Sequence, residues 1–132
     1  MQKLVAATLD SRVNNKFVII MSDQYQIEYY SDSVQMDILN LPDKLAARYI
    51  FLTRRMLAIG PNLGEPHTKA IKDGLFELRL KGSEGIARIF YCTLVGKRIV
   101  MLHSFIKKTG RTPSRELETA MNRLKERKRE KT

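Results

Sequence analysis

The stretch of residues 74–108 constrains the fold of this chain more than any other. It contains three runs of apolar, β-branched and aromatic residues, at 75–81, 86–95 and 98–106, separated by short turns that contain glycine. Runs of this length joined by such turns are typical of consecutive antiparallel strands. The sequence therefore predicts an antiparallel meander of three strands.

Side chains alternate between the two faces of a strand, and this alternation separates polar from apolar residues in the meander. In the first strand Glu77, Arg79 and Lys81 share one face, while apolar residues occupy the other. In the second strand Arg88 falls among apolar residues on its own face. These positions make Arg79, Lys81 and Arg88 candidates for one cationic group on the sheet.

The third strand ends in two lysines that fall on opposite faces. Lys107 shares a face with His103 and Phe105, whereas Lys108 shares the face of Ser104. The alternation alone leaves the register between strands open, and we expect Lys108 to join the cationic group. The group expected on the sheet is Arg79, Lys81, Arg88 and Lys108.

Helical patterns lie on both sides of the meander. Residues 25–30 alternate as a first strand, residues 34–39 form a short helix after a run of capping residues, and residues 42–59 form a longer helix. Residues 112–113 begin a last, C-terminal helix with a narrow apolar seam. The apolar stripe of the longer helix recurs at three- and four-residue spacing and comprises Leu45, Tyr49, Leu52, Met56 and Ile59.

These elements predict an α+β fold in which a helical hairpin packs on a small, mainly antiparallel sheet, with a C-terminal helix. Residues 61–73 are expected to be a polar loop, with His67 exposed in it. Residues 1–22 are expected to be an accessory extension, or the product of a misassigned start with Met21 as the true initiator. The compact domain is then 23–132.

Composition narrows the classes of function. The chain has 132 residues and a formal net charge of +10. The segment 69–132 holds 17 basic and seven acidic residues, so its own net charge is also +10. A one-sided basic surface is the expected footprint of a polyanion partner, nucleic acid first, although a merely solvated surface remains open. The sole cysteine, Cys92, excludes an intramolecular disulfide. No apolar run reaches the roughly 20 residues of a membrane span, so we expect a cytoplasmic protein.

Conventional enzyme motifs are absent from the sequence. It has no glycine-rich phosphate loop, no nucleophile elbow and no pattern of metal ligands, so no metal or cofactor is expected. A cluster of arginine and lysine suits RNA cleavage by the neighbouring 2′-hydroxyl, because cations stabilise the charge that develops on phosphorus. Ordinary exposed strand charges are the alternative interpretation.

The segments LPDKLAARY, GPNLGEPHTKAIKDGLFELRLKGSEGIARIFYC and KRIVMLHSFIKKTGRTPSRELETAMNRL occur in order over about residues 24–127. This succession resembles the phage-derived, HigB-like branch of the RelE/ParE toxin superfamily. The pieces GLFELR, IARIFY and LHSFIKKT are jointly specific, although each alone is weak. The resemblance implies a RelE-like fold and the toxin of a type II toxin–antitoxin system.

The resemblance also assigns roles to residues by position. Arg88 corresponds to the family arginine that contacts the scissile phosphate, and Lys108 to a second cation for the transition state or leaving group, with Lys107 beside it. Arg79 lies where RelE carries a lysine implicated in proton transfer. Glu77 stands where RelE has another lysine, so the proton-transfer scheme of RelE cannot be copied onto this chain.

Further residues are expected to bind RNA or the ribosome. These are Lys81, Lys107, Arg111 and His103. Some HigB toxins use histidines in catalysis, which makes His103 a substitute for the missing lysine. Its position opposite Lys108 instead favours a packed strand histidine, unless a bulge redirects it.

The function that follows is a metal-independent mRNA interferase: an endoribonuclease that enters the ribosomal A site and inhibits translation. Its expected partners are the ribosome, messenger RNA and a helix-turn-helix antitoxin, in a toxin–antitoxin hetero-oligomer, and no membrane. One alternative is a ParE-like inhibitor of a topoisomerase such as gyrase. Another is a non-catalytic nucleic-acid-binding module.

Overall fold

The computed structural model describes residues 24–108 and 111–130, so the extension predicted at 1–22 lies outside the described residues. Five strands form one sheet in the order β1-β5-β4-β3-β2, in which β1 is parallel to β5 and the other pairs are antiparallel. The strands are β1 (Gln26–Tyr29), β2 (Thr68–Lys72), β3 (Leu75–Gly82), β4 (Gly85–Leu94) and β5 (Arg98–Lys107), and the helices are α3 (Asp32–Leu39), α4 (Asp43–Ile59) and α5 (Ser114–Arg129). The predicted α+β class with a mainly antiparallel sheet is confirmed.

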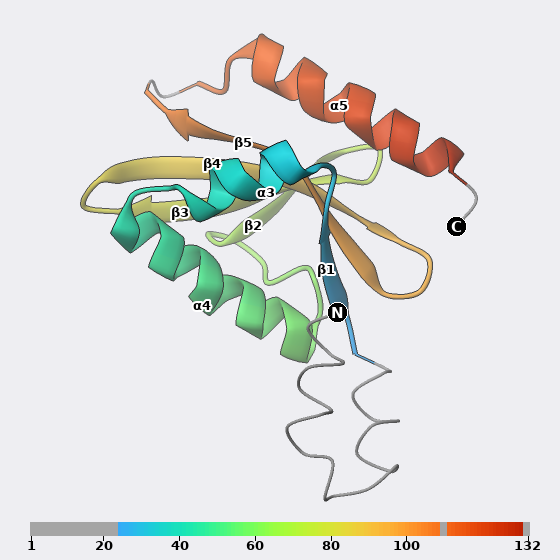
Figure 1. Cartoon of the computed structure of the whole chain (residues 1–132), viewed down its shortest axis with the longest axis horizontal. Helices are drawn as coiled ribbons and strands as arrows, with labels where there is room; N and C mark the ends of the chain where they lie inside the picture. The colour runs from blue at the N-terminus through green and yellow to red at the C-terminus, as the bar shows by residue number, and fades with distance from the viewer. Residues whose placement is uncertain (1–23, 109–110, 131–132) are drawn as a thin grey trace, which may run out of the picture.

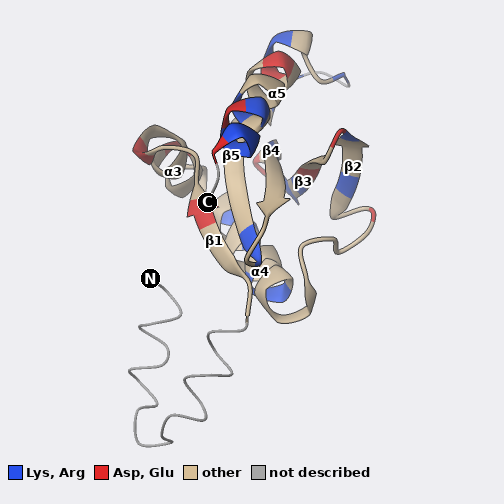
Figure 2. Cartoon of the chain, turned by 90° about the vertical axis from the view of Figure 1, so that its right-hand side faces the viewer, with Lys and Arg blue, Asp and Glu red and all other residues tan. Residues whose placement is uncertain are grey.

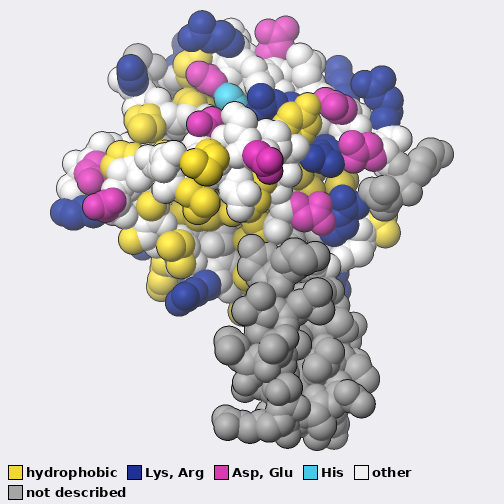
Figure 3. Space-filling view, in the orientation of Figure 1, with side chains coloured by type: hydrophobic (Ala, Val, Ile, Leu, Met, Phe, Trp, Pro, Cys, Tyr) yellow, Lys and Arg dark blue, Asp and Glu magenta, His cyan; other side chains and the backbone are white. Residues whose placement is uncertain are grey.

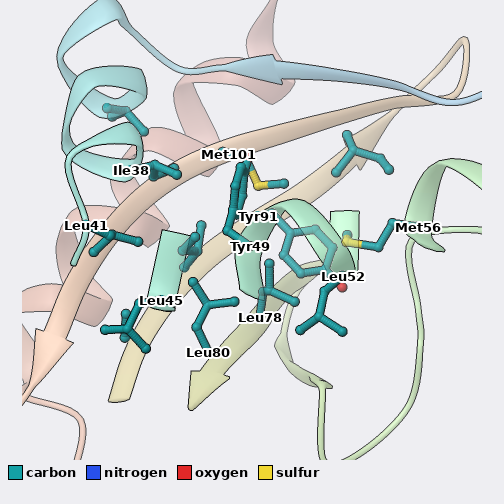
Figure 4. Close-up of a cluster of buried hydrophobic side chains, with 14 residues drawn as sticks. Ile38, Leu41, Leu45, Tyr49, Leu52, Met56, Leu78, Leu80, Tyr91 and Met101 are labelled. Atoms are coloured by element: carbon teal, nitrogen blue, oxygen red, sulfur yellow. The ribbon is translucent and has the colours of Figure 1, made fainter. Parts of the chain in front are cut away.

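Helices α3 and α4 pack on one face of the sheet and form the larger core (Figure 1). Ser31 caps α3 by accepting a hydrogen bond from the backbone of Val34, and Pro42 precedes the first turn of α4. Figure 4 shows the apolar stripe of α4 facing the strands. Its buried members are Leu45, Tyr49, Leu52 and Met56. Ile59, predicted in the same stripe, is 68% exposed at the end of the helix.

Helix α5 packs across the other face of the sheet and covers a second, smaller core (Figure 1). Ala120 and Leu124 on its narrow seam are buried against the strands. Two arginines of α5 stack on the ring of Tyr30, and they also donate hydrogen bonds to backbone carbonyls of Leu102 and Tyr30. The C-terminal helix predicted from the sequence therefore lies on the sheet, held by polar contacts as well as its seam.

Strand β2 corrects one expectation, because it lies in the segment 61–73 that was predicted to be a polar loop. This strand pairs with β3 through a two-residue turn in which Asp73 and Gly74 have φ angles of 53° and 89°. Positive φ at both central positions is typical of the tight hairpin turn that Asp-Gly favours. The hairpin adds a strand beside β3 and fixes residues 67 and 68 against it.

A bulge in β5 decides which side chains of that strand face α5. Phe90 pairs with His103 and Tyr91 pairs with Met101, so Leu102 is an extra residue. The extra residue shifts the alternation by one. On the C-terminal side of the bulge, the residues facing α5 are His103, Phe105 and Lys107.

The face that α3 and α4 present to the outside carries exposed apolar side chains, visible over both helices in Figure 3. The large exposed residues there are Met36, Leu39, Ile50, Phe51 and Ile59. Basic side chains are placed differently: many lie on α5 and on strand β2 (Figure 2). The cations of interest for function belong to the sheet itself, on the side that α5 packs against.

Candidate functional site

Three neighbouring strands place their charged residues in adjacent rows on the α5 side of the sheet. Arg79 of β3 lies opposite Arg88 of β4. In the next row Lys81 lies opposite Ile86, which in turn lies opposite Lys107 of β5. Directly opposed residues of paired strands share a face, so the two arginines and two lysines form one cationic group.

A buried ion pair lies at the centre of this group. Nη1 of Arg88 donates a hydrogen bond to Oε2 of Glu77 over 2.7 Å. Arg88 is 6% exposed and Glu77 is 3% exposed. A buried charge is tolerated only with a partner, and each member supplies one for the other. Glu77 therefore fixes one end of the Arg88 guanidinium.

The rest of that guanidinium has unused hydrogen-bonding capacity. Nε of Arg88 is enclosed and has no hydrogen-bond partner among the described residues, and the same is true of Nε of Arg79. Arg79 reaches the other oxygen of Glu77 with a separation of 3.9 Å between Nη2 and Oε1. One carboxylate thus lies between two guanidinium groups that each retain an unsatisfied donor. Such donors suit the oxygens of a phosphate.

Lys107 belongs electrostatically to the same group. Its pKa is lowered by burial and by the charges of Arg88 and Arg79, and Glu77 opposes this shift. The expectation that Lys108 completes the group needs correction, because the bulge in β5 places Lys107 on the face of Arg88. Lys108 follows the last residue of β5 and its side chain is exposed.

His103 lies on the same face but is engaged elsewhere. Its Nε2 is 2.5 Å from Oε1 of Glu116 in the first turn of α5. The imidazole also stacks on Phe105 with 6.2 Å between ring centroids. The bulge thus does redirect His103, as the sequence analysis allowed, but it directs the ring towards α5. The ring position is consistent with a histidine that helps to fix α5 on the strand.

A pocket of about 270 Å³ opens beside the two arginines. Its wall is formed by Arg48, Pro66, His67, Arg79, Lys81, Ile86 and Arg88. Of the seven site residues predicted from the sequence, three line it. The exposed Arg111 lies in the segment before α5, outside this wall. His67 and Arg48 were missed.

One signal could have predicted the strand that leads from His67, but not its register. The Asp73-Gly74 dipeptide predicts a hairpin, and regular pairing back from that turn would put residue 67 opposite Leu80; a bulge between Ala70 and Lys72 shifts it to Arg79. Arg48 comes from α4, on the other side of the sheet, and reaches the pocket around the edge of β3. No pattern in the sequence indicates that approach.

Within 24–108 and 111–130, no three histidine, cysteine or acidic side chains gather as a metal site. No helix in the same ranges is long and apolar enough to cross a membrane. The side chains that line the pocket supply guanidinium, ammonium and imidazole groups.

The chain matches the model of a known protein family. The family model of phage-derived Gp49-like proteins matches residues 36–125. The matched segment begins in α3 and ends in α5, so it includes every residue that lines the pocket. No curated protein matches the chain.

Proposed function

We propose that this chain, which belongs to the Gp49-like family of phage-derived proteins, is the toxin of a type II toxin–antitoxin system and cuts messenger RNA on the ribosome. The family is toxin-like and of the RelE/HigB type. The observation that carries the proposal is the cationic pocket, in which the buried Arg88 keeps an unsatisfied donor. We assign the chain to the HigB-like branch on the motifs around Arg79, Arg88 and Lys107.

The reaction proposed is attack by the 2′-hydroxyl of a nucleotide on its own 3′-phosphate. The phosphorus then carries five oxygens and an additional negative charge, and cations held in place before the reaction stabilise that charge. Arg88 contacts the scissile phosphate and Arg79 contributes a second guanidinium beside it. Guanidinium groups keep their proton at neutral pH, so these residues stabilise charge and do not transfer protons.

Glu77 has a positioning role in this scheme. Its carboxylate holds Nη1 of Arg88 and so fixes the orientation of the guanidinium beside the pocket in which the phosphate binds. A side chain with several rotatable bonds loses less entropy on binding when one end is already fixed. The acid that departs from the RelE pattern therefore supports phosphate binding in this chain, and a RelE-like lysine at this position would leave the Arg88 charge unpaired.

Lys107 and Lys108 supply the cations on the leaving-group side. The lowered pKa of Lys107 makes its ammonium a better proton donor to the departing 5′-oxygen. Lys108, exposed just beyond β5, is placed to contact the RNA backbone. Lys81, Arg111 and the basic last turns of α5 extend the positive surface towards RNA and the ribosome.

The proposed partners are the ribosomal A site with its messenger RNA and a helix-turn-helix antitoxin. Members of toxin-like families typically pair with an antitoxin. A protein that cuts messages must be restrained in its own host, which favours a toxin–antitoxin hetero-oligomer. Metal ions and cofactors have no part in the scheme, because 2′-hydroxyl attack needs only proton transfer and charge stabilisation.

The deciding experiment is expression of this chain alone in a bacterial host, followed by mapping of new 5′ ends in messenger RNA. We expect cuts in register with codons that disappear when translation initiation is blocked. Growth arrest with intact messages would instead favour topoisomerase inhibition, and binding without arrest would favour a non-catalytic module. The matched variants are Arg88→Lys, at the pocket, and Arg55→Lys, on the exposed side of α4.

A further inference from the structure

His67 lies in the same row of the sheet as the two arginines of the pocket. Thr68, the first residue of β2, is opposite Leu78 of β3, so His67 comes opposite Arg79. The backbone N–H of Arg79 donates to the carbonyl of His67 over 2.9 Å, which fixes this pairing. Because opposed residues share a face, the imidazole is on the side of Arg79 and Arg88, and it lines their pocket.

The imidazole of His67 is available for chemistry. The residue is half-buried, where the sequence predicted an exposed loop histidine. Its backbone is held twice, since its N–H also donates to the carbonyl of Gly64 over 3.0 Å. Its ring makes no hydrogen bond or ion pair within the part of the chain that the structure describes, whereas the ring of His103 is bound to Glu116.

Among the described side chains that line the pocket, His67 is the one that offers a nitrogen able to accept a proton as a general base. Guanidinium and ammonium groups such as those of Arg79, Lys81 and Arg88 are hydrogen-bond donors. Glu77 is 3% exposed and its Oε2 is occupied by Arg88. Imidazole is the side-chain group used most often in general acid–base catalysis.

We propose that His67 is the general base that removes the proton from the attacking 2′-hydroxyl of RNA. This inference rests on the function proposed above and assigns to His67 the proton-transfer role for which the RelE pattern uses lysines at the positions of Glu77 and Arg79. The ligand in the pocket is a ribonucleotide phosphate whose 2′-hydroxyl faces His67 while its phosphate oxygens face Arg79 and Arg88.

The step balances without any co-reactant. The neutral imidazole nitrogen accepts the 2′-hydroxyl proton as the bond between O2′ and phosphorus forms. The bond between phosphorus and O5′ breaks, and the ammonium of Lys107 gives a proton to the departing oxygen. The products are a 2′,3′-cyclic phosphate and a 5′-hydroxyl. Imidazolium and amine then return to their starting forms by exchange with water.

The test compares His67→Gly with Ala70→Gly, a glycine variant at an exposed position of the adjoining strand β2, on ribosomes that carry the cleaved codon found by 5′-end mapping. Single-turnover cleavage is measured with ribosome binding as a separate readout. Removing a general base costs on the order of 10²–10⁴-fold in rate. We expect that loss for His67→Gly with binding unchanged, and partial recovery on adding free imidazole. Ala70→Gly is expected to cut within a few-fold of the unaltered protein.

A second substrate separates a base from an acid. A message with sulfur in place of the scissile O5′ has a leaving group that needs no proton. On this message we expect His67→Gly to be slower than the unaltered protein by the same factor as on the natural message, because the 2′-hydroxyl still needs its base. Recovery of full rate on this substrate would make His67 the acid and overturn the proposal.

Two further outcomes are decisive. If the unaltered protein cuts and His67→Gly cuts within a few-fold of its rate, the assignment of His67 is wrong while the proposed function stands. If the unaltered protein leaves every message intact, both fail. His67→Gln, which keeps the size of the side chain, replaces His67→Gly should the glycine variant not fold, and the same loss is expected without imidazole recovery.

Discussion

The two faces of the sheet carry different kinds of side chain. Against α3 and α4 the described strands present mostly apolar side chains, with the buried Thr68 as a polar exception, and this core is continuous from β3 to β5. On the α5 side an apolar cluster around Phe90 and Leu102 adjoins the charged rows that hold Glu77 and Arg88. The comparison shows how one small sheet can be anchored by its first face and can hold charged groups on part of its second.

The charged rows depend on the apolar ones for their geometry. Glu77 is opposite Phe90, one row from Arg88, and both charges are buried by the neighbours that form the second core. Enclosure strengthens an electrostatic interaction, because water screens it less. The same enclosure makes any unpaired member costly. Changes at the charged rows should therefore affect stability and activity together, whereas changes in the first core should affect stability alone.

The largest expected effect comes from breaking the buried pair. Arg88→Ala removes the short ion pair of the buried Glu77 and leaves it only the 3.9 Å contact with Arg79, which we expect to cost up to about 3–5 kcal/mol of unfolding free energy. Loss of one charge-stabilising group also costs about 10²–10³-fold in cleavage rate. Chemical denaturation and single-turnover cleavage measure the two effects.

A double variant separates these two effects. Arg88→Met together with Glu77→Gln removes both charges, so most of the lost stability should return while cleavage stays low. If the double variant were as unstable as Arg88→Ala, the ion pair would not be the source of the instability. If it cut RNA normally, the pair would be structural only.

The second prediction compares one leucine from each core. Leu52 of α4 is 0% exposed and Leu124 of α5 is 1% exposed. Replacing a buried leucine by alanine costs about 2–5 kcal/mol. We expect Leu52→Ala near the upper end, because its core is the larger, and Leu124→Ala near the lower end. Urea denaturation measures both, and a larger cost at Leu124 would contradict the ranking of the two cores.

Much of this comparison could be predicted from the sequence, and the limits have physical causes. Alternation within β3 correctly separated Glu77, Arg79 and Lys81 from the apolar face, because that strand is regular. Alternation within β5 also grouped Lys107 with His103 and Phe105 correctly. Which of the two lysines faces Arg88 depends instead on the bulge at Leu102, which shifts the alternation and brings Lys107 to that face. A bulge leaves no clear mark in a continuous apolar run.

The pocket was less predictable than the strands. His67 and Arg79 are brought together by a hairpin whose first strand, TKAIK, has little apolar content. The Glu77–Arg88 pair depends on cross-strand register, which side-chain alternation alone does not fix. The charged residues of the site could thus be identified in the sequence, but the residues that they contact could not.

The third prediction distinguishes the two lysines at the end of β5. Lys107→Ala should lower cleavage by about tenfold or more, because it removes the proton donor, and Lys108→Ala should have a smaller effect. Cleavage of programmed ribosomes measures both rates. A larger loss at Lys108 would restore the assignment implied by the family pattern and would mean that β5 adopts a different register on the ribosome.

The lowered pKa of Lys107 also makes the stability of the folded protein depend on pH, in a direction that can be stated. Burial lowers its pKa in the folded protein, with help from Arg88 and Arg79, so the unfolded chain binds this proton more tightly. The stability contributed by Lys107 therefore rises as pH increases through the lowered pKa. Labelled-lysine NMR should show Lys107 titrating at lower pH than its value in the unfolded chain. The shift should diminish in Arg79→Gln.

The smallest effect is expected at Cys92, which reports how well α5 closes the second core. Its side chain is buried in the cluster with Ala120 and Leu124, and burial raises the pKa of the thiol to about 11. Thiolate is the reactive form, so a thiol reagent at neutral pH should modify the folded protein far more slowly than the unfolded chain. Leu124→Ala should speed modification by loosening α5, whereas Leu52→Met, which conserves volume in the first core, should not. Fast modification of the unaltered protein would show that α5 leaves this face intermittently, and the charged rows would then belong to a more open surface.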